Sequence, residues 1–156
     1  MTRVDHFHDP AAPAANSIVV AVTAFVLDAD RRVLLIRRTD NGLWALPGGA
    51  QDIGETVTEA AARETWEESG VEIEVVGLVG IYSNPRHVIA FSDGEVRQQF
   101  SICLRGRAVG GSTRPSDESS DVDWFARDHL DALPMHPSMR LRVDHGYAEL
   151  PAPYIG

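Results

Sequence analysis

GAQDIGETVTEAAARETWEESGV, residues 49–71, is the most informative stretch of this sequence. If residues 56–69 are helical, Glu64, Glu67 and Glu68 fall on one side of the helix, at spacings i, i+3 and i+4. Like charges at these spacings repel by roughly a few tenths of a kcal/mol per pair, and by more where water is scarce. A neutralising cation is therefore expected, and carboxylate oxygens suit Mg²⁺ or Mn²⁺. The stretch predicts a divalent-metal site, of the kind that commonly serves phosphate chemistry.

The alternative is an ordinary glutamate-rich helix with a solvated acidic face. The phase of the helix argues against this alternative. At about 100° per residue, Val57, Ala61, Glu64 and Glu68 fall within roughly 60° of one another. Val57 and Ala61 are apolar and should face the core, so the carboxylates continue a buried stripe instead of lying opposite it.

The residues that flank this helix predict where it begins and ends. Thr56 followed by Glu59 is a capping-box pattern, and Gly70 is placed to stop the helix. Before the helix, residues 47–49 and Gly54 form a loop whose backbone can approach a ligand closely. A glycine-rich loop before a helix also offers free N–H groups to phosphate oxygens, although plain turn chemistry explains glycine there equally well.

The same residues resemble a known pattern. Gly49, five residues, Glu55, seven residues and then RETWEESGV at residues 63–71 are similar to the Nudix box, GX5EX7REUXEEXGU, in which U is a bulky aliphatic residue. Every fixed position matches, and Thr65 departs from the usual aliphatic residue. The resemblance extends from about residue 18 to residue 125.

Many short strands with two or three helices indicate an α+β fold, an α/β/α layered sandwich. The resemblance implies a Nudix fold, with a mixed β-sheet between helices. We expect a flexible tail at residues 1–16, one Nudix hydrolase domain at 17–150 and a C-terminal tail at 151–156. The expected strands lie near residues 18–27, 32–37, 43–46, 72–82, 87–91, 96–107 and 122–125, and the further helices near 127–133 and 138–147.

Composition limits the class of protein. The 156-residue chain has a formal net charge of −9, which disfavours phosphate contacts with long nucleic acids. No apolar run approaches the roughly 18 residues of a membrane span, and the first residues lack the apolar core of a signal peptide. The single cysteine, Cys103, suits a reducing compartment. We therefore expect a cytoplasmic protein with no membrane partner.

The resemblance implies a reaction. Nudix enzymes use Mg²⁺ or Mn²⁺ to hydrolyse the pyrophosphate bond of a nucleoside diphosphate linked to another group, so a small nucleotide is the expected substrate. A homodimer is possible by the same resemblance. The resemblance to the Nudix box also implies that Arg63 orients a carboxylate and that Glu55 lies at the edge of the site. The implied metal ligands are the Gly48 carbonyl, Glu64, Glu67 and Glu68.

The general base stays open between the box glutamates, with Glu64 and Glu67 among the catalytic candidates, and a glutamate on a later loop. Glu118 is the best candidate outside the box and Glu95 the second. The alternative for Glu118 is a solvated loop residue. A base must reach the attacking water by a hydrogen bond, which a sequence does not show.

The identity of the substrate is the property that the sequence determines least. In the family, a proline about as far beyond the box as Pro85 is associated with ADP-ribose-type substrates, which slightly favours ADP-ribose or a nucleotide sugar over a (d)NTP. Arg37, Arg86 and Trp44 are candidates for substrate binding. A catalytically silent nucleotide-binding or regulatory module is the alternative function. The histidines that show no metal-ligand spacing, and to which no role is assigned, are His87, His129, His136 and His145.

Overall fold

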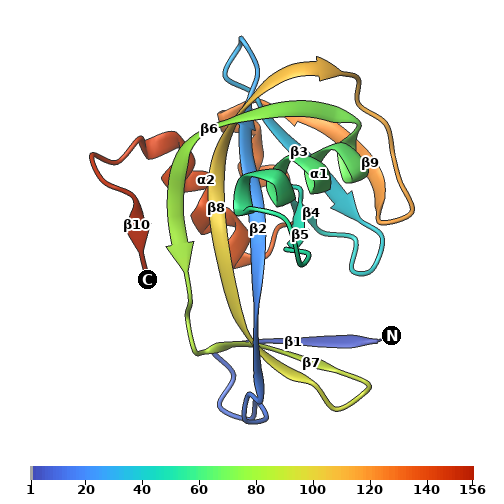
Figure 1. Ribbon diagram of the computed structural model, residues 1–156, viewed down its shortest axis with the longest axis vertical. Helices are drawn as coiled ribbons and strands as arrows, with labels where there is room; N and C mark the ends of the chain where they lie inside the picture. Colours follow the sequence, from blue (N-terminus) through green and yellow to red (C-terminus); the bar gives the residue numbers. More distant parts are fainter. Residues whose placement is uncertain (1) are drawn as a thin grey trace.

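The computed structural model describes residues 2–156, which form one ten-stranded sheet with helices packed on it (Figure 1). The strands are β1 (Arg3–Phe7), β2 (Ser17–Leu27), β3 (Val33–Arg38), β4 (Trp44–Ala45), β5 (Gly48–Ala50), β6 (Val71–Tyr82), β7 (His87–Phe91), β8 (Val96–Gly111), β9 (Ser119–Phe125) and β10 (Tyr154–Ile155). The helices are α1 (Val57–Ser69), the 3₁₀ helix η1 (Arg127–Ala132) and α2 (Pro137–Ala148).

The sheet is mixed, as expected. The main path runs β1-β7-β8-β2-β3-β4, with β6 also paired to β8 and β9 to β3. Strands β2 and β8 are parallel, from Ser17 opposite Arg97 to Leu27 opposite Arg107. Strand β8 pairs antiparallel with both β6 and β7. Hence β8 connects the box side of the molecule to the lobe formed by β1 and β7.

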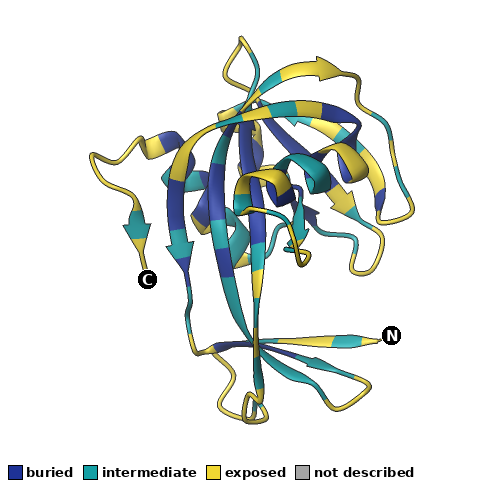
Figure 2. Cartoon of the chain, in the orientation of Figure 1, coloured by how far each residue is buried: buried dark blue, intermediate teal, exposed yellow. Residues whose placement is uncertain are grey.

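The helices cover opposite faces of β2. Because side chains alternate along a strand, Val22 and Phe25 point to different sides of the sheet. Val22 packs with Ala60 and Ala61 of α1, whereas Phe25 packs in a cluster that includes Val143 of α2. Figure 2 shows the buried residues gathered between these helices, with the far end of β2 exposed. This arrangement is the α/β/α layering that the sequence predicts.

The two terminal segments differ from the expectation of tails. Arg3–Phe7 forms β1, which pairs antiparallel with β7 in a register that places Arg3 opposite Phe91. Tyr154 and Ile155 form β10, which runs parallel to β6. Both strands depend on partners more than 70 residues away in the sequence, so composition near the termini gives no sign of them.

Other differences are smaller. Strand β8 continues to Gly111 and β9 begins at Ser119, so both strands extend beyond the expected ranges of 96–107 and 122–125. The short helix after β9 is a 3₁₀ helix. A hairpin turn at Asp93-Gly94 joins β7 to β8, with Gly94 at a positive φ of 94°. Among residues 2–156, no helix is long and apolar enough to cross a membrane.

Candidate active site

The acidic helix is positioned by its caps and its packing. Thr56 accepts a hydrogen bond from the Glu59 N–H, and Glu59 accepts one from the Thr56 N–H, which completes the predicted capping box. Gly70 ends the helix in the left-handed conformation, with φ 77°. Thr65, the departure from the Nudix pattern, is fully buried, and its hydroxyl donates to the Ala61 carbonyl at 2.7 Å. A threonine therefore fits this core position without an unpaired polar atom.

Arg63 connects the carboxylates of the box. Its Nε and Nη2 donate to the Glu55 carboxylate, at distances between 2.7 and 3.2 Å. Its Nη1 donates to Glu64 at 2.9 Å and to Glu67 at 3.2 Å. A planar guanidinium suits this pattern because several of its five donors can be used at once in a fixed plane. Arg63 thus fixes the orientation of three carboxylates.

The glycines of the loop let its backbone lie against the remaining carboxylates. The Gly48 N–H donates to Glu68 Oε1 at 2.7 Å. Any side chain at Gly49 would collide with Glu64, whose Oε1 lies 2.5 Å from the position of a Cβ. Gly48 is also held in β5, opposite Thr23 of β2. The loop and helix therefore form one unit, with the Glu64 and Glu68 carboxylates facing the glycine backbone.

Burial makes these carboxylates unusual. Glu68 is only 4% exposed, and burial raises its pKa to about 8 although the Gly48 N–H opposes the shift. Burial likewise raises the pKa of Glu64, with Arg63 opposing. The nearby charge of Glu118 raises the pKa of both groups further. Nearby carboxylates that resist ionisation are the groups that a cation stabilises.

The donor set fits a hard divalent cation. Glu64, Glu67 and Glu68 offer only oxygen, and the Gly48–Gly49 backbone lies against Glu64 and Glu68. Oxygen-only ligand sets suit Mg²⁺ or Mn²⁺. Glu67 differs from the other two because its side chain is 50% exposed. The box residues therefore fit the metal site expected from the sequence.

Glu118 and Glu95 have different surroundings. Glu118 lines the same pocket as Glu68 and is held by its backbone, whose carbonyl accepts from the Thr39 N–H at 3.1 Å. Glu95 instead accepts two hydrogen bonds from Arg97, at 2.9 and 3.0 Å, beside the hairpin turn. Of the two glutamates outside the box, the structure brings only Glu118 to the box carboxylates.

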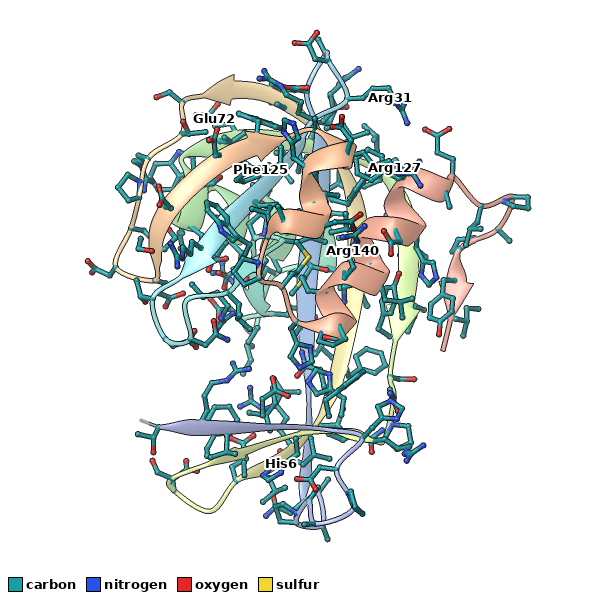
Figure 3. The ribbon with its side chains drawn as sticks, turned by 180° about the vertical axis from the view of Figure 1, so that it is seen from behind. His6, Arg31, Glu72, Phe125, Arg127 and Arg140 are labelled. Carbon is teal, nitrogen blue, oxygen red and sulfur yellow. The ribbon has the colours of Figure 1, made fainter. Side chains whose placement is uncertain are left out.

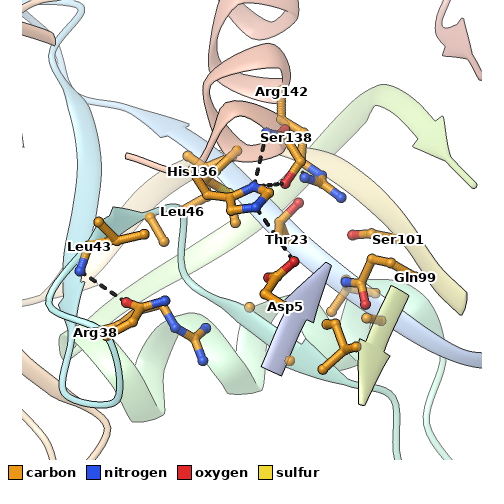
Figure 4. A pocket seen from close by; sticks show the side chains of 18 of the residues that line it. Asp5, Thr23, Arg38, Leu43, Leu46, Gln99, Ser101, His136, Ser138 and Arg142 are labelled. Atoms are coloured by element: carbon orange, nitrogen blue, oxygen red, sulfur yellow. Dashed lines mark hydrogen bonds and ion pairs between the residues drawn. The ribbon is translucent and has the colours of Figure 1, made fainter. Parts of the chain in front are cut away.

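A pocket of about 240 Å³ opens beside Glu68 and extends toward α2 (Figure 4). Trp44 lines this pocket and packs edge-on against Phe125. Arg37 and Arg86 do not line it. Arg37 donates from Nε to the Gly42 carbonyl at 3.0 Å, and Arg86 lines a separate cavity. Of the three proposed substrate-binding residues, only Trp44 lies at the pocket.

Arg142 of α2 was missed by sequence reasoning. It lines the pocket, is only 3% exposed, and donates from Nη1 to the Ser138 carbonyl at 2.8 Å. Its guanidinium also lies 4.7 Å from the centre of the Tyr82 ring. Within residues 2–156 its Nε has no hydrogen-bond partner, and neither has Ser101 Oγ, which also lines the pocket. Burial lowers the pKa of Arg142, with no carboxylate among the opposing groups.

Sequence reasoning missed this residue because α2 carries a second arginine two positions earlier. Arg140 lies on the outer side of α2, where it pairs with Asp131 and Asp144, each at 2.9 Å (Figure 3). Arg142 is two residues later and turns inward (Figure 4). Met139, Val143 and Tyr147 form an apolar stripe along α2 at spacings i, i+4 and i+8, and Arg142 lies at the edge of this stripe, where an arginine usually reaches solvent.

Two of the histidines left without a role also line the pocket. His87 of β7 and His136, at the N-cap of α2, both lie beside Asp5 of β1. Asp5 and His87 are 82 residues apart in the sequence, His87 and His136 are 49 apart, and Asp5 and His136 are 131 apart. No local sequence pattern could therefore reveal the cluster. Only the pairing of β1 with β7 brings them together.

Comparison with known proteins agrees with this geometry. The sequence model of the NUDIX domain matches residues 18–145, most of the chain. This protein therefore belongs to the Nudix family. Its fold resembles that of a NUDIX hydrolase from Nitrosomonas europaea, with a TM-score of 0.74 and 23% identity over 90% of this chain and 78% of that one.

Relatives carry several names. A "MutT-like protein" of Streptomyces ambofaciens is 39% identical over 71% of this chain and 66% of its own length. An "ADP-ribose pyrophosphatase" of Methanocaldococcus jannaschii is 35% identical over 69% of this chain and 62% of its own. A "Nucleoside triphosphatase NudI" of Enterobacter sp. (strain 638) is 30% identical over 64% of this chain and 73% of its own length. The chain thus spans somewhat less than two thirds of the length of the first two relatives.

Proposed function

We propose that this chain is a divalent-metal-dependent pyrophosphohydrolase, which cleaves the pyrophosphate bond of a nucleoside diphosphate linked to another group. The observation that carries the proposal is the buried Glu68 carboxylate, which lines the pocket and is held with Glu64 against the Gly48–Gly49 backbone. Mg²⁺ or Mn²⁺ bound by the Gly48 carbonyl, Glu64, Glu67 and Glu68 would neutralise phosphate charge and lower the pKa of a water molecule.

The other residues of the box prepare this site. Arg63 holds Glu64 and Glu67 in fixed directions, which reduces the reorganisation needed when a substrate phosphate arrives. Glu118, at the opening of the pocket, is the proposed general base and would take a proton from the attacking water. A box glutamate is the competing base. Glu118→Gln discriminates between them, because a base lost outside the box lowers kcat while metal affinity is retained.

The deep end of the pocket favours a substrate rich in hydrogen-bond acceptors. Arg142 and Ser101 present unpaired donors there, and Trp44 adds an aromatic wall. A buried guanidinium without a carboxylate partner is costly unless a ligand supplies acceptors. We propose that Arg142 binds the part of the substrate farthest from the metal. The ribose phosphate or sugar of an ADP-ribose-type substrate provides such acceptors.

The substrate class has two candidates. An ADP-ribose or nucleotide-sugar substrate is favoured by the relative named as an ADP-ribose pyrophosphatase and by Pro85, which lines a cavity adjoining the pocket. A (d)NTP substrate is second, on the name of the triphosphatase relative. The product pair separates them: AMP plus ribose phosphate in the first case, nucleoside monophosphate plus pyrophosphate in the second.

The test is hydrolysis across ADP-ribose, sugar nucleotides, NADH, dinucleoside polyphosphates and the (d)NTPs, each with Mg²⁺, with Mn²⁺ and with chelator. Metal-dependent cleavage of one class supports the proposal and identifies the substrate from its products. Binding of one of these nucleotides without hydrolysis, at saturating metal, would instead support a silent nucleotide-binding module. The Glu68→Gln variant is the matched control for hydrolysis by a contaminating enzyme.

A further inference from the structure

We propose that Asp5, His87 and His136 form a second metal site, distinct from the box, which binds a divalent transition ion such as Zn²⁺ and fastens β1 beside the pocket. The three side chains come from β1, β7 and the start of α2. Two imidazoles and one carboxylate are a common ligand set for Zn²⁺, and an oxygen-only site such as the box is not.

The geometry is that of converging ligands. Nε2 of His87 lies 2.8 Å from Asp5 Oδ1, and Nε2 of His136 lies 3.6 Å from the same oxygen. All three ligand atoms lie within 4.8 Å of one another. Around a tetrahedral Zn²⁺ with bonds of about 2.0–2.1 Å, neighbouring ligand atoms are about 3.4 Å apart. To reach this geometry the contact between Asp5 and His87 opens slightly and the two stacked imidazole rings rotate, because each ring must hold the ion close to its own plane.

The β1–β7 pairing and the Phe7 ring hold the ligands in place. Asp5 and Phe7 lie on one face of β1, and His87 is the register partner of Phe7 on β7. The His87 and His136 rings stack at 5.0 Å with an interplanar angle of 10°. Phe7 packs edge-on against both rings, at 5.3 and 5.1 Å, and gives the site an apolar wall.

His136 also has an outer partner. Metal binding at Nε2 leaves the ring proton on Nδ1, where Ser138 Oγ, 2.8 Å away, can accept it. Without metal, Nδ1 accepts the Ser138 N–H at 3.2 Å and caps α2. Binding exchanges this cap for the contact with the hydroxyl. Because three ligands leave a position open and all three residues line the pocket, that position faces the pocket.

The site couples the N-terminal strand to the pocket wall. Strand β1 lies at the edge of the sheet and contacts the rest of the molecule mainly through β7. An ion shared by β1, β7 and α2 would connect this strand to the helix that carries Arg142. The direct readouts are therefore metal affinity and the order of β1, neither of which requires catalytic activity.

The experiment is titration of the full chain with Zn²⁺ in excess Mg²⁺, which occupies the oxygen-only box, with Co²⁺ absorption as the spectroscopic probe. We expect one tight Zn²⁺ per chain and an intense visible Co²⁺ band that reports imidazole ligation. His136→Ser should weaken binding by about 100-fold or more, beyond the 10- to 100-fold typical of losing an outer-shell partner. Serine keeps a good N-cap, so α2 remains formed. Asp5→Asn should weaken binding similarly while it keeps a hydrogen-bond acceptor for His87.

His6→Ala is the matched control, because His6 lies on the same strand but pairs with Asp9, at 2.8 Å, instead of joining the cluster. This variant should bind Zn²⁺ and Co²⁺ as the parent chain does. Hydrogen exchange of the β1 amides should slow when Zn²⁺ is added to the parent chain and not when it is added to His136→Ser. The proposal is overturned if excess Mg²⁺ abolishes Zn²⁺ binding, or if His136→Ser binds as tightly as the parent. The cluster would then be a hydrogen-bonded contact alone.

Discussion

The two walls of the pocket are built in different ways. On one side, residues 48–70 supply every carboxylate of the box, together with the arginine that orients three of them, from one continuous segment. On the other side, Asp5, His87, His136 and Arg142 come from three separate parts of the chain, which are β1, β7 and α2 with its N-cap. The first wall is a local structure with a defined start and end. The second exists only once the sheet has formed.

This contrast suggests that the two walls have different roles in catalysis and in substrate selection. The box wall gathers carboxylates where a cation would bind, and the opposite wall presents a buried guanidinium and imidazoles. A nucleotide with phosphates at one end and acceptor groups at the other would match both walls. Chemistry would then depend on the box, and selection of the substrate on the opposite wall.

The largest effect should follow from removing one charge in the box. Glu68→Gln should lower kcat by on the order of 100-fold or more, because loss of a ligand should exceed the 10- to 100-fold effect of an outer-shell change. The fold should persist, since the buried amide is nearly isosteric with the carboxylate. Steady-state kinetics at saturating Mg²⁺, with circular dichroism as the check on folding, measures this. Wild-type turnover in this variant would show that the metal lies elsewhere.

A variant on the opposite wall should show a different signature. Arg142→Met keeps an apolar stem but removes the buried cation, so kcat/KM should fall by about 10- to 100-fold, from a lost charged hydrogen bond of about 1.5–3 kcal/mol. Most of the loss should appear in KM. Stability should rise or stay level, because the parent buries a cation without a carboxylate partner.

Arg140→Met is the matched control for this variant, since Arg140 pairs with acidic groups on the outer side of the same helix. Its kinetics should match the parent. If Arg142→Met instead lowered stability and left KM unchanged, Arg142 would be a structural residue of α2. The proposal that the wall containing Arg142 selects the substrate would then be wrong.

The same contrast explains what could be predicted from the sequence. The capping box, the end of α1 at Gly70 and the burial of Glu68 follow from spacings within about four turns of helix, so they were predictable. The strand at Arg3–Phe7 was not, because its only strong signal is pairing with a strand about 80 residues later. Arg142 was missed because it flanks the apolar stripe of α2, a position at which an arginine usually reaches solvent.

Burial of the box carboxylates should make the free energy of unfolding depend on pH. Folded Glu68 keeps its proton up to a pKa of about 8, whereas in the unfolded chain it ionises near 4.5. Unfolding therefore releases a proton between these values, and the free energy of unfolding should fall as pH rises through that window, by about 1–3 kcal/mol in total. Urea unfolding with chelator present, from about pH 5 to about pH 8.5, measures this slope.

Glu68→Gln should flatten much of that slope, leaving a smaller part from Glu64, whose pKa is raised in the same direction. Added Mg²⁺ should restore the stability of the parent chain above neutral pH and have little effect on the variant. If the free energy of unfolding of the parent chain rose with pH in the presence of chelator, the pKa values of the box carboxylates would not be raised in the folded state.

The smallest effect tests whether the box wall is local. Thr56→Ala removes the side chain that accepts from the Glu59 N–H at 3.1 Å and should cost about 1 kcal/mol of stability, the usual cost of losing an N-cap. Thr56→Ser should recover most of this, and Thr113→Ala, in the exposed loop after β8, should cost almost nothing. Because a local cap acts on the start of α1 alone, Zn²⁺ affinity and KM should not change. A cap variant that altered either would mean that the two walls fold as one cooperative unit and not as separately specified parts.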